Sequence, residues 1–274
     1  MTKERIAFVD YIRVIACLLV MVVHASEQFY NMGPVSQVAT EDNRLWVSIY
    51  DGFFGRISVP LFMIVSAFLL VPMREGATMS QFYRRRFLRI LPPFVCFLVL
   101  YAVLPATWGG LTWEEAVEQL KMVPFNFPLW GGHLWFMYPL ISLYLIIPVV
   151  SPWLERSSAK DERIFLGIFA FSTLTREFCT PNVLLATFGA FLLFTCIEKA
   201  PRWINSLAKL TFGMYLMHIF FLVFIAEWII GGNVARPLLP VWLAIPVIGL
   251  LTFLCCAVTT KLLSLIPGSK YVIG

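Results

Sequence analysis

Eight long apolar runs divide the chain, and this pattern constrains the fold more than any other feature of the sequence. A helix needs about 20 apolar residues to cross the ~30 Å hydrocarbon core of a bilayer, and it satisfies its own backbone hydrogen bonds there. We therefore expect an all-α, polytopic transmembrane helix bundle of about eight spans, forming a single domain over residues 1–274. The runs cover about residues 7–31, 53–72, 90–108, 134–153, 164–174, 183–197, 208–230 and 241–266.

Composition supports a multi-pass protein of the cell membrane, whether a bacterial inner membrane or a plasma membrane. Only 14% of residues are charged, against about 25% in soluble domains, so membrane lipids are the expected surroundings. Nucleic acid is not an expected partner, because the positive clusters coincide with the gaps between apolar runs. The N-terminal MTKERIAFVD lacks the small-residue cleavage site of a secretory signal, so the first run is expected to remain as a span. The sequence makes no prediction of an oligomeric state.

Positive charges alternate between the gaps that separate the runs, and the positive-inside rule then predicts that both termini are cytoplasmic. The runs 164–174 and 183–197 are short for full spans, which leaves three readings open. They are re-entrant segments, thin tilted elements buried among neighbours, or remnants of a sequence that lacks a stretch near 174–182. Between the third and fourth runs, TWEEAVEQLKMV within 109–132 predicts a short amphipathic helix at the membrane interface.

The first run carries three polar side chains that are costly inside a membrane: Asp10, Arg13 and His24. Arg13 and His24 are eleven residues apart, so on a helix they return to within about 20° of one face, about 16 Å apart along the axis. Asp10 lies one turn before Arg13 on the same face. Charges in such a segment usually face a polar interior and serve function. A neutral imidazole can take a proton from a hydroxyl, so we interpret this face as the wall of an active site.

Arginines gather in YRRRFLRILPPF, where Arg86 and Arg89 share a helix face and Arg85 points to one side. Guanidinium groups suit phosphates because they offer planar, bidentate donors. The same cluster is also typical of any positively charged cytoplasmic loop or of contacts with anionic lipid headgroups. Pro92 and Pro93 are expected to bend or to start the third span.

Three further polar sites interrupt the later runs. His133 lies at the outer end of the fourth run in GHLWFMYPL, where an interfacial anchor is the alternative reading. Tyr215 and His218 lie on one polar stripe of LTFGMYLMHIFF, which indicates a surface that faces the bundle interior. Ser66, in PLFMIVSAF, either joins a polar site or bonds to its own helix. The six cysteines show no disulfide or zinc spacing and are expected to be packing residues, so no metal is predicted.

Taken together and in order, these motifs resemble the acyltransferase 3 family of integral-membrane acyltransferases. The stretches that carry the resemblance are DYIRVIACLLVMVVH, RRFLRILPPF, PLFMIVSAF, GHLWFMY and LTFGMYLMH. The motif histidine of the family maps onto His24, the motif arginine onto Arg13, and the paired arginines onto Arg86 and Arg89. Family members have about ten spans, against eight apparent runs here, and Ser66-Ala67 replaces their usual Ser-Gly. The chain is similar to a stand-alone form without an appended esterase-like domain.

The resemblance implies transfer of an acyl group, usually acetyl, from cytoplasmic acyl-CoA to a hydroxyl of an extracytoplasmic acceptor such as a surface polysaccharide or a lipid-linked sugar. Arg86 and Arg89, with Arg85 beside them, would hold the CoA phosphates, and Arg13 would join them or balance Asp10. His24 would act as a general base, or would carry the acyl group itself. His133, Tyr215, His218 or Ser66 would contact the oxyanion or the acceptor.

The alternative class is a transporter or flippase. Intramembrane Asp, Arg and His side chains also make proton relays and substrate paths. Such a protein would have no need of acetyl-CoA, so release or binding of CoA discriminates between the two classes.

Overall fold

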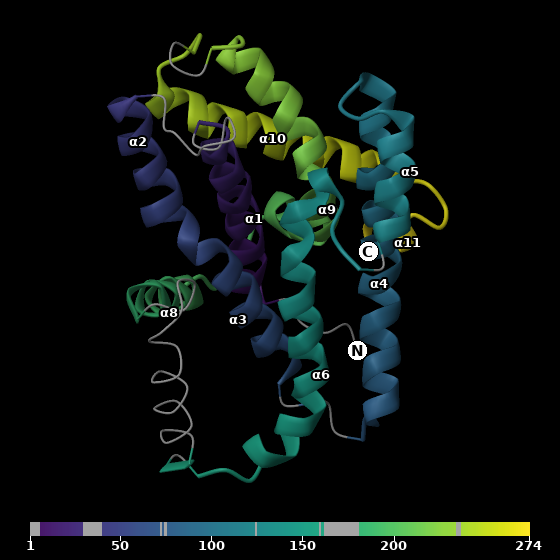
Figure 1. Ribbon diagram of the computed structural model, residues 1–274. Coiled ribbons are helices and arrows are strands. Elements are labelled where there is room, and N and C mark those ends of the chain that lie inside the picture. Colours follow the sequence, from purple (N-terminus) through teal and green to yellow (C-terminus); the bar gives the residue numbers. More distant parts are fainter. Residues whose placement is uncertain are drawn as a thin grey trace.

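The computed structural model describes residues 6–29, 40–71, 73, 76–123, 125–158, 160–161, 181–233 and 237–274. Every element in these ranges is a helix, and the helices form a bundle in which α1 lies in the interior (Figure 1). The α-helices are α1 (Ala7–Glu27), α2 (Glu41–Val47), α3 (Ser58–Leu70), α4 (Met79–Val103), α5 (Trp113–Met122), α6 (Met137–Leu154), α8 (Pro181–Thr195), α9 (Arg202–Ile230), α10 (Val241–Leu263) and α11 (Lys270–Ile273). The other helical segments are η1 (Ser48–Phe54), η2 (Gly55–Ile57), η3 (Leu104–Trp108) and η4 (Leu129–Phe136).

Six helical stretches are long and apolar enough to cross a membrane, which confirms a polytopic helix bundle. They are 7–27, 41–70, 79–108, 129–154, 202–230 and 241–263. The expected run 183–197 corresponds to α8, which is shorter than a span and packs against α1 and α3. The expected run 164–174 and the stretch near 174–182 lie outside the described residues, apart from the first residues of α8.

Two spans begin earlier than hydropathy predicts because their first turns are polar. The second starts at Glu41 rather than near residue 53, and Thr40 caps it by accepting a hydrogen bond from the Asn43 backbone N–H. The third, α4, starts at Met79 after a similar cap by Thr78. Its two prolines, Pro92 and Pro93, therefore lie inside a continuous helix and do not start it.

Helix α1 sets the register of the bundle because it packs against both α9 and α10. The Cys17 thiol lies 3.7 Å from the Thr211 carbonyl, and the rings of His24 and His218 are also neighbours. The seven residues from Cys17 to His24 on α1 thus correspond to the seven from Thr211 to His218 on α9. The two helices therefore run parallel. Helix α10 runs the other way, since Gly249 lies against Val22 while Thr260 lies against Gly213 near the start of α9.

The amphipathic helix predicted within 109–132 is α5. Thr112 and Glu115 form a reciprocal capping box at its start, and Ala116 is its buried residue. The hydrogen bond that Glu115 accepts from the Thr112 backbone N–H lowers the pKa of its carboxyl. Helix α5 packs against α4 and η3.

Candidate functional site

The three histidines of the chain meet at one level of the bundle although they come from three different helices. His24 lies on α1, His133 on η4 and His218 on α9. The ring centroid of His218 is 5.0 Å from that of His24 and 4.7 Å from that of His133, and the third pair is 6.3 Å apart. The rings of Tyr101 and Tyr215 lie 4.9 Å and 5.9 Å from His133. We call His24, His133 and His218 the histidine cluster.

One nitrogen of each ring in the histidine cluster is engaged by an acceptor. The contacts are His24 Nδ1 to Glu27 Oε2 at 2.6 Å, His218 Nδ1 to the Tyr215 carbonyl at 2.6 Å, and His133 Nε2 to the Leu216 carbonyl at 3.4 Å. Carboxylates and carbonyls only accept hydrogen bonds, so these nitrogens carry the hydrogen. The second nitrogens of the neutral rings are therefore acceptors.

Two of these second nitrogens, Nδ1 of His133 and Nε2 of His218, are buried and have no hydrogen-bond partner among the described residues. A buried polar atom left in this state costs about 1–3 kcal/mol. A hydroxyl or water that enters the cluster would remove that cost by donating to them.

His24 is the member of the cluster that solvent reaches, with a side chain that is 16% exposed. Its partner Glu27, one turn further along α1, is 43% exposed. A carboxylate bonded to Nδ1–H orients the ring, leaves Nε2 as the basic nitrogen and stabilises the imidazolium once a proton arrives. The sequence prediction did not include Glu27, and its signal is the three-residue spacing in HASE.

A second ion pair extends this polar site toward η1 and η2. The Arg56 guanidinium lies 3.2 Å from the Asp51 carboxylate, and Arg56 is also within electrostatic range of Glu27. Gly55 allows this approach, because a Cβ there would lie 2.1 Å from the Val23 side chain. Neither member of this pair was predicted from the sequence, since both lie in a segment with no periodic pattern.

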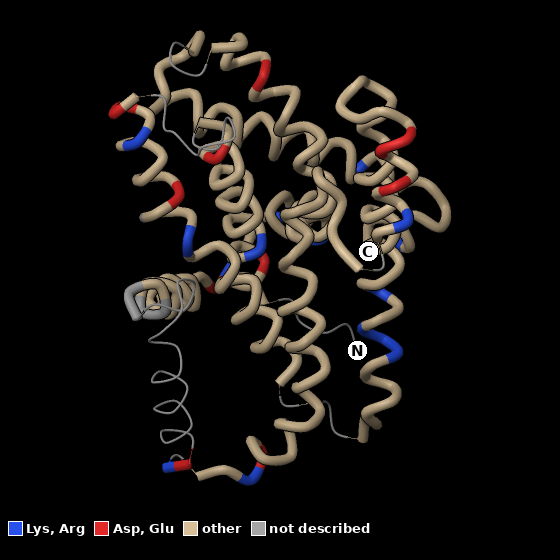
Figure 2. The backbone as a smooth tube through the Cα atoms, viewed as in Figure 1, with Lys and Arg blue, Asp and Glu red and all other residues tan. Residues whose placement is uncertain are grey.

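Cations gather at the other end of α1, at what we call the basic end: Arg13, Arg86 and Arg89. All three lie within electrostatic range of the buried Tyr144 of α6. Helix α4 is joined to α6 at this level because the Tyr83 hydroxyl donates to the Leu145 carbonyl. Figure 2 shows the Lys and Arg residues of α4 gathered on one stretch of the helix. The basic end and His24 are separated by the eleven residues of α1, or about 16 Å.

The remaining predicted site residues occupy different positions. Asp10 is buried one turn before Arg13, and Arg85 is exposed on α4. Ser66 is half-buried on α3, eleven residues past Gly55 and so about 16 Å from the level of Val23. It thus lies nearer the basic end than the histidine cluster.

Within the described ranges, no group of three or more His, Cys, Asp and Glu side chains is arranged to hold a metal ion. The cysteines in those ranges are free thiols: Cys17, Cys96, Cys196, Cys255 and Cys256.

Comparison with known proteins identifies the family. A family model described as an acyltransferase domain, Acyl_transf_3, matches residues 6–176. The chain belongs to the acyltransferase 3 family. The matched part of this membrane acyltransferase contains α1, α4 and η4, and with them His24, His133 and the whole basic end, whereas α9 with His218 lies beyond it. The searches of curated proteins and of solved structures returned no match.

Proposed function

We propose that this acyltransferase moves an acyl group, most commonly acetyl, from cytoplasmic acyl-CoA to a hydroxyl of an extracytoplasmic acceptor. One observation carries the proposal. A histidine–carboxylate pair, His24 with Glu27, stands on the same helix as Arg13 of the basic end, about 16 Å away. Such a helix joins a site for anions to a site for proton transfer.

The donor enters from the basic end, which the positive-inside rule assigns to the cytoplasm. Arg86 and Arg89 hold the phosphates of CoA, with Arg13 beside them, because guanidinium groups bind phosphate bidentately. The charged nucleotide stays at this end, since hydrocarbon excludes it. The thin, uncharged pantetheine arm reaches along α1 and brings the thioester to His24.

The chemistry at His24 is general-base catalysis. Nε2 accepts the proton of the acceptor hydroxyl while the hydroxyl oxygen attacks the thioester carbonyl, and the resulting imidazolium is stabilised by the Glu27 carboxylate. When the tetrahedral intermediate collapses, the C–S bond breaks and the same proton passes from Nε2 to the leaving thiolate. The products are an ester and CoA with a free thiol.

The other two histidines serve the acceptor rather than the oxyanion. The Tyr215 hydroxyl already donates to the His133 carbonyl, at 2.5 Å, and the open nitrogens of His133 and His218 are acceptors in the neutral rings. In this proposal they receive hydrogen bonds from hydroxyls next to the one that reacts. A polyhydroxylated acceptor, such as a surface polysaccharide or a lipid-linked sugar, provides such neighbours.

The test uses the full chain purified into lipid nanodiscs. With acetyl-CoA and a hydroxyl-rich glycan fraction from a cell envelope, wild-type protein is expected to release CoA thiol, and His24→Gln is not. A burst of CoA release equal to the amount of protein, without acceptor, would show that the acyl group first rests on the protein, and its absence in His24→Gln would assign it to His24. A transporter or flippase would neither bind CoA nor release its thiol, and that result would overturn the proposal.

A further inference from the structure

The ion pair of Asp51 and Arg56 stands beside His24 because the second span touches α1 at that level. Both η1 and η2 pack against α1. Gly55, the residue before Arg56, lies so close to Val23 that a Cβ would overlap its side chain, and Val23 is the residue before His24. The backbone contact therefore brings a second set of charges to the catalytic base. We call Asp51 and Arg56 the counter-charge pair.

A π-helical turn makes the counter-charge pair. Where η1 meets η2, the Gly55 backbone N–H donates to the Tyr50 carbonyl, five residues back. On a regular α-helix, residues five apart point about 140° away from each other, so Asp51 and Arg56 would not meet. In this segment the Arg56 guanidinium donates to the Asp51 carboxylate at 3.2 Å. Segments of π-helix are rare and occur mostly at functional sites.

The counter-charge pair is partly sheltered from solvent, with the carboxylate side chain 28% and the guanidinium side chain 36% exposed. Glu41 and Arg44, which pair on the same span, are 89% and 65% exposed. Sheltered charges are screened less by water and salt. The counter-charge pair lies within electrostatic range of Glu27, and its Asp51 carboxylate also lies within range of His24.

Together with Glu27, the counter-charge pair gives His24 surroundings that carry one net negative charge. Two carboxylates and one guanidinium add to that value while the imidazole is neutral. Protonation of His24 then makes the four groups neutral as a whole. Loss of the guanidinium would leave two negative charges around the base, and loss of the Asp51 carboxylate would leave none.

The other titratable side chains next to His24 do not belong to this ion pair. His133 and His218 face its ring, with Tyr101 and Tyr215 behind them. The Tyr50 hydroxyl of η1 donates to the Trp242 carbonyl of α10. The thiols of Cys17 and Cys256 lie one or more turns further along the bundle, since Cys17 is seven residues before His24. Replacement of the counter-charge pair leaves all of these groups in place.

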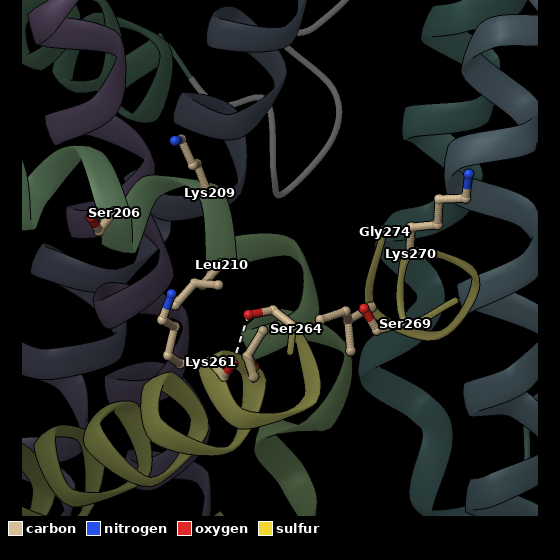
Figure 3. A pocket seen from close by; sticks show the side chains of 10 residues that line it. Ser206, Lys209, Leu210, Lys261, Ser264, Ser269, Lys270 and Gly274 are labelled. Carbon is tan, nitrogen blue, oxygen red and sulfur yellow. Dashed lines mark hydrogen bonds between the residues drawn. The ribbon is translucent and has the colours of Figure 1, made fainter. Parts of the chain in front are cut away.

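The remaining charges on the helices that pack against α1 are exposed to solvent. In Figure 3, Lys209 and Lys261 surround a pocket at the start of α9. Lys209 is nine residues before His218, or about 14 Å along the axis. The described part of α8 and the whole of α3 carry no charged residue. The exposed residues are Glu41, Asp42 and Arg44 of α2, Arg202, Lys209 and Glu227 of α9, and Lys261 of α10.

We propose that Arg56 is a positioning residue which, balanced by Asp51, acts through Glu27 to set how strongly His24 holds a proton. The inference rests on the general-base role of His24 proposed above. Without Arg56, two carboxylates would keep the imidazole protonated, and a protonated ring cannot accept the proton of the acceptor hydroxyl. Asp51 limits the effect of the guanidinium, so that Glu27 still stabilises the imidazolium when it forms.

The experiment measures how kcat/KM for acetyl-CoA depends on pH, from the CoA thiol that the full chain releases in nanodiscs with the glycan fraction. A general base must be neutral, so kcat/KM rises with pH along an acid limb. Arg56→Gln removes a cation and should move this limb to higher pH by about half a pH unit or more. Asp51→Asn removes an anion and should move the limb to lower pH. In Asp51→Asn/Arg56→Gln the two changes oppose each other, so the limb should return toward that of wild type.

Arg44→Gln is the matched control, because it breaks an exposed ion pair on the same span. It is expected to leave the acid limb in place. Arg56→Lys keeps the positive charge and is expected to keep the wild-type limb, which separates charge from folding. A shift of both single variants in the same direction, or of neither, would overturn the proposal while acyl transfer by the wild type stands. A wild-type protein that releases no CoA would overturn acyl transfer itself, and this inference with it.

Discussion

Nδ1 of His24 lies 2.6 Å from Oε2 of Glu27, one turn further along the same helix. The pair is only partly buried, while His133 and His218 beside it are almost fully enclosed. A carboxylate in this position orients the imidazole and stabilises its charged form. The relationship makes Glu27 a positioning residue for the base.

Replacement of Glu27 is therefore expected to slow catalysis without affecting donor binding. Glu27→Gln keeps an oxygen that can accept from Nδ1–H but removes the negative charge, so kcat should fall by about 10- to 100-fold while the Kd for CoA stays the same. Glu227→Gln is the control, since Glu227 is exposed on α9. An equal loss of kcat in both variants would show that Glu27 has no special role.

His24→Ala is expected to abolish acyl transfer in a protein that still folds. Loss of a general base usually costs about 10²- to 10⁴-fold in rate, and the side chain is at the edge of the core rather than inside it. Steady-state CoA release measures the rate, and size-exclusion behaviour with the thermal midpoint reports folding. Turnover at the wild-type rate would refute the mechanism.

The sequence predicted that Tyr215 and His218 share an interior helix face, but not how the helices bring polar residues together. Regular geometry placed Tyr215 and His218 on an interior stripe, and both are buried. The meeting of His24 with His133 and His218 depends on the parallel register of α1 and α9, which no local pattern encodes. Glu27 was not predicted as a site residue, because a single carboxylate at the end of an apolar run indicates the end of the helix equally well.

The starts of two spans differ from the predicted apolar runs for a related reason. Hydropathy detects only the apolar part of a span, so the polar first turns of the second span and of α4 fell outside the predicted runs. The arginines of α4 were therefore assigned to a helix face by spacing alone. Their proximity to Arg13 required the packing of α4 on α6, through Tyr83 and Leu145.

Arg86 and Arg89 are expected to control donor affinity. In Arg86→Gln/Arg89→Gln the Kd for CoA should rise by about 10- to 100-fold, because charge-assisted hydrogen bonds to phosphate are each worth about 1.5–3 kcal/mol. The value of kcat at saturating donor should change little, since neither residue approaches His24. Isothermal titration calorimetry with CoA measures the Kd.

Arg84→Gln is the control for that measurement, because Arg84 is exposed on the same helix two residues from Arg86 and faces another direction. If CoA binds the double variant as tightly as wild type, the phosphates are held elsewhere.

Gly55 is expected to be the glycine on which the geometry around Glu27 depends. In Gly55→Ala, the new methyl group would lie 2.1 Å from the Val23 side chain and 3.0 Å from the Tyr50 carbonyl, so α1 and η2 must separate. Overpacking of this kind costs about 1–3 kcal/mol of stability. Separation would also move Arg56 away from Glu27, so kcat should fall together with the thermal midpoint.

Gly52→Ala is the matched control on the neighbouring η1, where a Cβ would meet nothing within 4 Å. A Gly55→Ala protein as stable and as active as Gly52→Ala would show that the close approach of α1 to η2 does not hold the site together.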